Sequence, residues 1–267
     1  IPPYPAELSW IEKIHSPHYI QHVQEACRAG YAYLDSGDTG ICPASYEIAR
    51  LAVGGVLAAV DAVMAGKVRN AFCAIRPPGH HAERTVALGF CIFNNIAIAA
   101  RYIQEKYHLS KVLIIDWDVH HGNGTQHAFY TDPGVFYFSI HQYPHYPGTG
   151  AWEECGAGAG LGTTLNAPMP PGCEDEDYLK VFSEKLKPEV KSFKPDFILI
   201  SAGFDAHRDD PLSGMCLTEE GFGQMTEMVK NFADQTCNGR IVSLLEGGYN
   251  LTALGRSVEQ HLRILKS

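Results

Sequence analysis

The chain has 267 residues, of which 45% are hydrophobic, so it can bury one sizeable core and falls within the size range of a single α/β domain. Its formal net charge of −9 argues against a protein that binds nucleic acid by neutralising phosphates, and it favours neutral or cationic ligands. No apolar stretch reaches the length of a membrane span, and the N-terminus, which begins "IPPYP", lacks the pattern of a signal peptide.

The eight cysteines form no C-x-x-C pair, and several lie inside apolar runs where a free cysteine behaves as a small hydrophobic residue. Cys91, between two aromatic residues in "GFCIF", is one that we expect in the core. This usage predicts a reduced, intracellular protein, and we expect it to be cytoplasmic.

Short runs dense in Val, Ile, Phe and Leu alternate along the chain with segments that carry apolar residues at a spacing of three to four. This alternation is typical of strand–helix–strand units, and it predicts a single α/β domain with a mostly parallel β-sheet flanked by helices on both faces. The predicted strands are Asn70–Ile75, Lys111–Ile115, Val135–Ile140, Asp196–Ser201 and Arg240–Leu245. The predicted helices are Ser45–Ala65, Asn95–Tyr107, Asp177–Val190, Thr218–Asp234 and Thr252–Leu265.

A glycine-rich stretch, residues 156–162, raises the alternative of a phosphate-binding loop. No apolar strand precedes it, and its glycine spacing does not match G-x-G-x-x-G. We therefore expect a surface loop at this point.

Polar side chains follow four of the predicted strands, at the point where each strand ends. The carboxyl ends of parallel strands meet at one edge of a sheet, which is where ligand sites form in open α/β sheets. We therefore expect these segments to converge on one site. The four segments are "RPPGHH" (residues 76–81), "DWDVHHGNG" (116–124), "AGFDAH" (202–207) and "EGGYN" (246–250).

Two of these segments supply a set of metal-binding donors. Asp118 and His120 are two residues apart beyond a strand end, so they can point to the same side, and Asp205 can add a third ligand from a neighbouring strand. Two carboxylates and one imidazole suit Zn²⁺, and three protein ligands leave a coordination position open for water. His121 and Asp116 are expected to be supporting residues, because adjacent side chains diverge.

The segments "RPPGHHAE…GFCIFNN", "DWDVHHGNGTQHAFY", "SAGFDAHRDDPL" and "LLEGGYN" resemble class II histone deacetylases and their bacterial relatives. The resemblance runs from about residue 10 to the end of the chain. It implies the arginase/deacetylase α/β fold and zinc-dependent hydrolysis of an acetylated amine, with residues 1–267 as one catalytic domain.

The resemblance also implies a role for individual residues. One Zn²⁺ per chain is expected on Asp118, His120 and Asp205. The expected catalytic residues are His80 and His81 as an acid–base pair, Asp116 and Asn123 as their partners, and Tyr249 as the hydroxyl that polarises the acetyl carbonyl. The expected substrate-binding residues are Gly89, Phe90, Tyr146, Leu212 and Asp38. One or two K⁺ ions are expected on backbone carbonyls of Asp116, Asp118, His120 and Ser139, and of Phe129, Asp132 and Val135.

The two adjacent histidines make chemical sense only if they differ. In the family the first pairs with an aspartate, here Asp116, whose charge favours imidazolium, whereas the second pairs with the position of Asn123, a neutral amide. We therefore predict that His81 is the general base and then acid, and that His80 is mainly an electrostatic partner.

Some of these positions have a simpler interpretation. Phe90 and Tyr146 could be core or loop-packing aromatics, and Asp38 beside Gly37 could be a turn-forming aspartate rather than a residue that holds substrate backbone. The chain also lacks the first strand and the His-Pro-Glu-like loop that the family carries upstream of residues 9–23, which leaves the width of the pocket mouth open.

Three functions stay open, with deacetylation of acyl-lysine in a protein or peptide favoured. The nearest alternative is hydrolysis of an acetylpolyamine or another small acyl-amine, against which Leu212 argues because it presents no charge to a cationic chain. A catalytically silent binding module is expected to have lost Tyr249 or a histidine, and an arginase-like hydrolase to need a second metal. We expect no direct nucleic-acid or membrane partner, and the oligomeric state is open, a homo-oligomer included.

Overall fold

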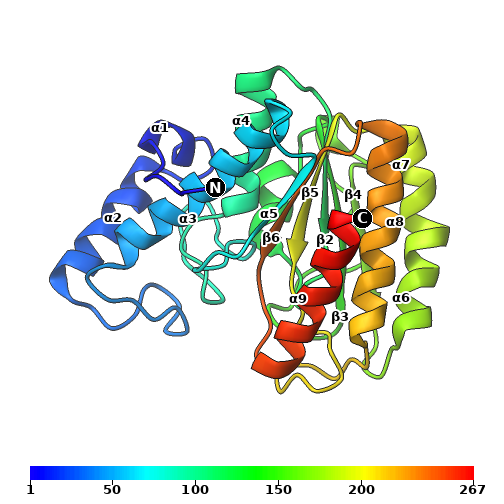
Figure 1. Ribbon diagram of the computed structural model, residues 1–267. Coiled ribbons are helices and arrows are strands. Elements are labelled where there is room, and N and C mark those ends of the chain that lie inside the picture. The colour runs from blue at the N-terminus through cyan, green and yellow to red at the C-terminus, as the bar shows by residue number, and fades with distance from the viewer.

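The computed structural model describes residues 1–267 as one α/β domain with a single six-stranded sheet (Figure 1). All five strand pairings are parallel, and the strand order is β1-β6-β5-β2-β3-β4. The prediction of a mostly parallel sheet is thereby confirmed. The strands are β1 (Asn70–Cys73), β2 (Val112–Asp116), β3 (Val135–Gln142), β4 (Thr164–Met169), β5 (Phe197–Ala202) and β6 (Ile241–Leu245).

Helices cover both faces of this sheet. In Figure 1, α1–α4 lie to one side of the strands, and α6–α9 lie to the other. The first group is α1 (Leu8–Ile11), α2 (Pro17–Ala29), α3 (Ser45–Met64) and α4 (Asn95–Tyr107), and the short α5 (Asn123–Phe129) follows β2. The second group is α6 (Asp175–Val181), the π-helical turn η2 (Phe182–Leu186), α7 (Lys187–Phe193), α8 (Glu219–Thr236) and α9 (Leu251–Lys266).

The central strand β2 shows why the sheet needs both layers. Side chains alternate between the two faces of a strand, so Val112 and Ile114 join the core beneath α3 and α4, whereas Leu113 and Ile115 join the core beneath α6–α9. All five residues of β2 are buried. A strand that is buried on both faces must carry a continuous apolar run, which is the signal that identified it in the sequence.

The five predicted strands and five predicted helices are all present, with some different bounds. β1 ends at Cys73 rather than at Ile75, and the predicted helix Asp177–Val190 is divided by the π-helical turn η2. The sequence analysis did not predict β4, α1, α2 or α5. β4 is an edge strand whose run contains Pro168 and lacks a continuous apolar pattern, so its pairing with β3 depends on tertiary contacts.

Three further expectations can be compared with the structure. The glycine-rich residues 156–162 lie in the connection between β3 and β4 with a single 3₁₀ turn, Gly158–Gly160, as expected for a loop. All eight cysteines are free, and Cys91 is buried as predicted. None of the helices combines the length and the apolar composition that crossing a membrane would require.

Candidate active site

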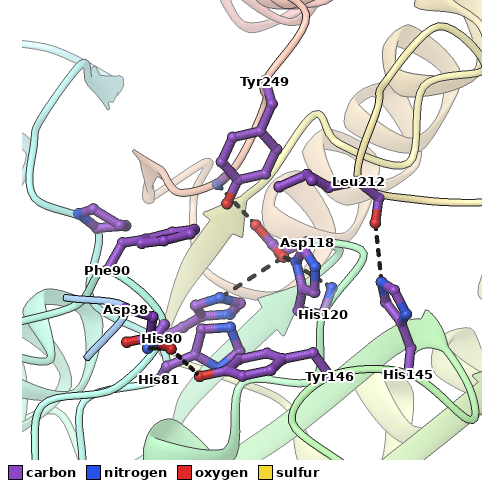
Figure 2. Close-up of a pocket in the computed structure, with 13 residues that line it drawn as sticks. Asp38, His80, His81, Phe90, Asp118, His120, His145, Tyr146, Leu212 and Tyr249 are labelled. Atoms are coloured by element: carbon purple, nitrogen blue, oxygen red, sulfur yellow. Dashed lines mark hydrogen bonds and ion pairs between the residues drawn. The ribbon is translucent and has the colours of Figure 1, made fainter. Parts of the chain in front are cut away.

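A cavity of about 380 Å³ opens at the carboxyl edge of the sheet (Figure 2). The segments that follow β1, β2, β5 and β6 all reach it, and the segment after β5 lines it through Leu212 rather than through the predicted residues 202–207. Side chains from segments far apart in the sequence therefore line one space. The lining residues are Asp38, Pro78, His80, His81, Gly89, Phe90, Asp118, His120, His145, Tyr146, Leu212, Gly247 and Tyr249.

Three buried side chains at this edge form a group that can hold a metal ion. The ligand atoms of Asp118, His120 and Asp205 all lie within 4.8 Å of one another. His120 Nδ1 is 3.1 Å from Asp118 Oδ1 and 3.2 Å from Asp205 Oδ2, and Asp205 Oδ2 has no hydrogen bond although it is buried. One proton cannot satisfy both carboxylates, whereas a cation between the three donors would, so the residues fit the predicted metal.

Backbone donors orient the two carboxylates of this group. The amide of Val119 donates to Asp205 Oδ1 at 2.9 Å, and the amide of Gly247, from the segment after β6, donates to Asp118 Oδ2 at 2.8 Å. Gly247 must be a glycine, because a Cβ atom there would collide with the carboxylate of Asp205. The "EGG" of this segment thus allows the backbone to approach the metal ligands closely.

His80 lies between two carboxylates. Its Nδ1 is 3.0 Å from Asp116 Oδ2, and its Nε2 is 3.7 Å from Asp118 Oδ1. Burial alone would lower the pKa of His80, but the charges of Asp116 and Asp118 raise that pKa to about 10. In the metal-free chain the two carboxylates therefore favour the imidazolium form of His80.

His81 lies in a different environment. Its Nδ1 is 2.7 Å from Asn123 Oδ1, and its ring is 4.0 Å from that of His80. Burial and the neighbouring charge on His80 hold the pKa of His81 well below its ordinary value. The pKa values of the two adjacent histidines are thus shifted in opposite directions.

Tyr249 enters the cavity from the segment between β6 and α9. Its ring points toward Asp118 and His120 in Figure 2, and it lies 6.1 Å from the ring of Phe90. Burial and the charges of Asp205 and Asp118 raise the pKa of the Tyr249 phenol, so the hydroxyl stays protonated and can donate a hydrogen bond.

Phe90 and Tyr146 form walls of the cavity. Their exposures are 42% and 38%, so the alternative of core aromatics is wrong. The Tyr146 ring stands perpendicular to the His81 ring at 5.2 Å, and its hydroxyl donates to Asp38 Oδ2 at 3.1 Å. Asp38 also bonds to Ser36 and Thr39, so this residue both stabilises its turn and lies at the cavity rim.

Comparison with known proteins agrees with this geometry. The model of the histone deacetylase domain matches residues 1–265. The chain belongs to the histone deacetylase family. A probable deacetylase of Archaeoglobus fulgidus is 43% identical over 249 residues, which are 93% of this chain and 68% of that protein. The chloroplastic histone deacetylase 10 of Oryza sativa subsp. japonica is 44% identical over 269 residues.

That match covers 97% of this chain but only 61% of the rice protein. Among solved structures, the crystal structure of the HDA15 HD domain superimposes with a TM-score of 0.95 at 38% identity. That match covers 100% of this chain and 77% of the other. Both the fold and the family of this deacetylase domain are thereby settled.

Sequence reasoning missed four polar residues that support this deacetylase site. His145 stacks on the His120 ring at 5.1 Å and donates from Nε2 to the Leu212 carbonyl at 3.0 Å, which joins two walls of the cavity. The carboxylates of Asp210, Glu246 and Glu83 each hold backbone or side-chain groups of a predicted catalytic residue. All three lie inside segments that carry the resemblance, but their partners lie about 40 or more residues away, so the sequence alone does not show which group each one contacts.

Proposed function

We propose that this histone deacetylase domain hydrolyses an acylated amine with one bound Zn²⁺, and that acetyl-lysine in a protein or peptide is its substrate. The observation that supports this most directly is the three-donor metal group placed next to two adjacent histidines, one bonded to a carboxylate and the other to a neutral amide. Hydrolysis of an amide needs an activated water, a stabilised oxyanion and a proton for the amine leaving group.

Zn²⁺ is the metal that fits the donor set best. Asp118, His120 and Asp205 offer two carboxylates and one imidazole, and three protein ligands suit a catalytic zinc. When bound, Zn²⁺ lowers the pKa of a coordinated water and polarises a carbonyl group. An arginase-like hydrolase would need a second metal with more carboxylate ligands, whereas Asp118, His120 and Asp205 supply the ligands of one metal.

Side chains of the protein carry out the proton transfers and stabilise the oxyanion. The pKa of His81 is lowered and its Nδ1 is bonded to Asn123, so its Nε2 can take the proton of the attacking water and then deliver it to the leaving amine. His80 lies between Asp116 and Asp118, and as an imidazolium it would stabilise the negative charge that develops beside it. The protonated hydroxyl of Tyr249 donates a hydrogen bond to the developing oxyanion.

The cavity walls support an acyl-lysine chain. Phe90 and Tyr146 offer aromatic faces to the methylene groups of the lysine, and Gly89 allows the wall to approach His81 closely. Asp38 at the rim can accept hydrogen bonds from the backbone amides of a peptide. An acetylpolyamine is the second candidate substrate, and the uncharged Leu212, which lines the cavity, disfavours its cationic chain.

We also propose that K⁺ binds to backbone carbonyls behind the site. Asp116 at the end of β2 is paired in register with Ser139 of β3, so that their carbonyls can join those of Asp118 and His120 in one group. The second group is formed by Phe129, Asp132 and Val135, between α5 and the start of β3. Carbonyl oxygens are suitable ligands for a hard alkali cation.

The eight free cysteines support a reducing, intracellular compartment for this chain, and we place it in the cytoplasm. We expect no nucleic-acid partner, in line with the net charge of −9.

The test is the rate of deacylation of purified, zinc-loaded protein on acetyl-lysine peptides, acetylpolyamines and lysines with longer acyl groups. We expect the highest kcat/KM on an acetyl-lysine peptide. Absence of turnover on every acyl-amine by a fully zinc-loaded protein would contradict the proposal and favour a silent binding module.

A further inference from the structure

Glu83 lies three residues after His80, outside the cavity, and has a direct contact with the partner of His81. Its Oε1 is 2.5 Å from Nδ2 of Asn123, and the same Nδ2 is 3.3 Å from the main-chain carbonyl of His81. On the other side of the amide, Asn123 Oδ1 is 2.7 Å from His81 Nδ1. Asn123 is buried, so its side-chain amide depends on these three contacts for its hydrogen bonds.

The contacts allow only one orientation of the Asn123 amide. An ionised carboxylate and a carbonyl are both acceptors, so the group that faces them must be the NH₂ donor. If the amide were turned by 180°, its oxygen would face two acceptors at once and its NH₂ group would face His81. Glu83 therefore directs Asn123 Oδ1 toward His81, independently of how amide nitrogen and oxygen atoms are assigned.

This orientation determines which nitrogen of His81 carries the proton. Asn123 Oδ1 can only accept, so His81 Nδ1 must donate, and in a neutral imidazole the lone pair is then on Nε2. His81 Nε2 has no hydrogen-bond partner within the protein, and the ring lines the cavity. The base is therefore directed at the space where substrate would bind.

We propose that Glu83 is a positioning residue that sets the tautomer of His81 through the amide of Asn123. This inference rests on the proposed function of His81 as the general base. The backbone of Glu83 is itself held in place, because the buried His15 donates from Nδ1 to the Glu83 carbonyl at 2.9 Å and accepts from the Asn94 amide at Nε2.

A simpler interpretation is that Glu83 serves only its surface neighbour. Its Oε1 also accepts from Nδ1 of His127 at 2.7 Å, and the His127 side chain is 51% exposed. H127Q removes this ion pair and leaves the contact with Asn123 in place. It is therefore the matched control, and we expect its kcat to stay within about twofold of wild type, since exposed pairs contribute little.

Two substitutions at position 83 test whether the site needs a hydrogen-bond acceptor there or only a polar side chain. In E83Q the amide oxygen can still accept from Asn123 Nδ2, so we expect kcat within about threefold of wild type, because one acceptor is kept. In E83K the side chain offers only donors. We expect kcat to fall by about tenfold or more with little change in KM, as a misdirected base loses part of its contribution of about 10²–10⁴.

The decisive variant is E83K combined with N123D. N123D alone places two carboxylates in contact and should also lose activity. In the double variant the carboxylate at position 123 pairs with the ammonium group at position 83. Both oxygens of this carboxylate are acceptors, so it can accept from His81 Nδ1 in either orientation. We expect kcat of the double variant to return to within about fivefold of wild type. If the two substitutions acted independently, their losses would add and the double variant would be slower than either single variant. A double variant that folds, binds zinc and stays as slow as E83K would overturn the inference.

The tautomer can also be measured without any turnover. In NMR spectra of protein labelled with ¹⁵N-histidine, the ring signals of His81 are identified as those that disappear in H81A. These signals should show Nδ1 protonated in wild type and in E83Q. E83K should shift His81 toward the Nε2-protonated form, and unchanged ring signals would overturn the inference even if activity fell. If E83K does not fold, E83L provides the same measurement without a new charge.

This design separates two kinds of failure. If H81A is as active as wild type, the proposed role of His81 fails while the tautomer measurement still tests Glu83. If H81A is inactive and E83K keeps both its rate and its Nδ1-protonated ring, the proposed function stands and the role of Glu83 is wrong.

Discussion

The carboxylate of Asp210 accepts a hydrogen bond from the backbone amide of Tyr249 at 2.7 Å. Its other oxygen accepts from the amide of Leu212 at 3.0 Å, and Asp210 is buried. One side chain thereby ties the loop after β5 to the segment that carries the phenol. The position of the Tyr249 hydroxyl thus depends on a residue that does not touch the cavity.

We therefore expect D210A to reduce both stability and catalysis. The amides of Leu212, Tyr249 and Asn250 would lose their acceptor, at a cost of about 1–3 kcal/mol for each group left without a partner in the free energy of unfolding. If Asp210 acts on catalysis through Tyr249, D210A should lower kcat much less in a Y249F background than in wild type. Denaturant unfolding and a double-mutant cycle measure these effects, and equal losses in both backgrounds would show that Asp210 acts elsewhere.

Removing a metal ligand should remove zinc and activity together. In D205A or H120A only two protein donors remain, which no longer fix the ion in place. Metal analysis after dialysis and the rate of deacylation check this in parallel. H127Q, outside the metal group, is the control and should keep its zinc. Full zinc occupancy with normal turnover in either ligand variant would rule out the proposed centre.

Y249F should separate metal binding from oxyanion stabilisation. The variant keeps the three metal donors and the aromatic ring and loses only the hydroxyl. We expect zinc content to be unchanged and kcat to fall by roughly 10²–10³, the scale of deleting one oxyanion donor. Steady-state kinetics on an acetyl-lysine peptide provide the measurement. A decrease of less than tenfold would mean that Tyr249 is not that donor.

The adjacent histidines should differ in how they respond to substitution. Because the pKa of His81 is lowered and that of His80 is raised to about 10, H81A should lose more activity than H80A in a pH–rate profile. A larger loss in H80A would reverse the assignment of base and electrostatic partner.

The pKa of His80 also predicts a pH dependence of stability in the metal-free chain. The folded-state pKa of about 10 lies above the unfolded value of about 6.5, so the charge on His80 stabilises the fold fully below pH 6.5. This contribution is lost as the pH rises toward 10. Thermal melts of metal-free protein should show H80A with a smaller decline of Tm over that window, and parallel curves would contradict the expectation.

Leu212 should influence the choice between peptide and polyamine. It lines the cavity without a charge, so a cationic polyamine chain finds no partner there. We expect wild type to prefer acetyl-lysine peptides over acetylspermidine in kcat/KM. L212E should shift that ratio toward the polyamine by about 1–3 kcal/mol, the scale of a hydrogen bond to a charged group. A tenfold preference of wild type for acetylspermidine would refute the expectation.

The sequence alone was enough to identify the buried strands and the polar residues that follow them. β2, β5 and β6 are buried on both faces, so each must be a continuous apolar run, and such a run is visible without any structure. The parallel arrangement then brings their carboxyl ends to one edge. That is why Asp118, His120 and Asp205 could be grouped before any distance was known.

The tertiary structure decided which distant polar groups meet. β4 is a strand only because it pairs with β3, and the helical stretch from Asp175 to Phe193 is divided by a π-helical turn that no periodicity marks. Asp210 meets Tyr249, and Glu83 meets Asn123, each across about 40 residues. Hydrophobic periodicity reports which side chains are buried, but the partner of a buried polar group is chosen by the packing of whole elements, so the sequence contains no local signal for it.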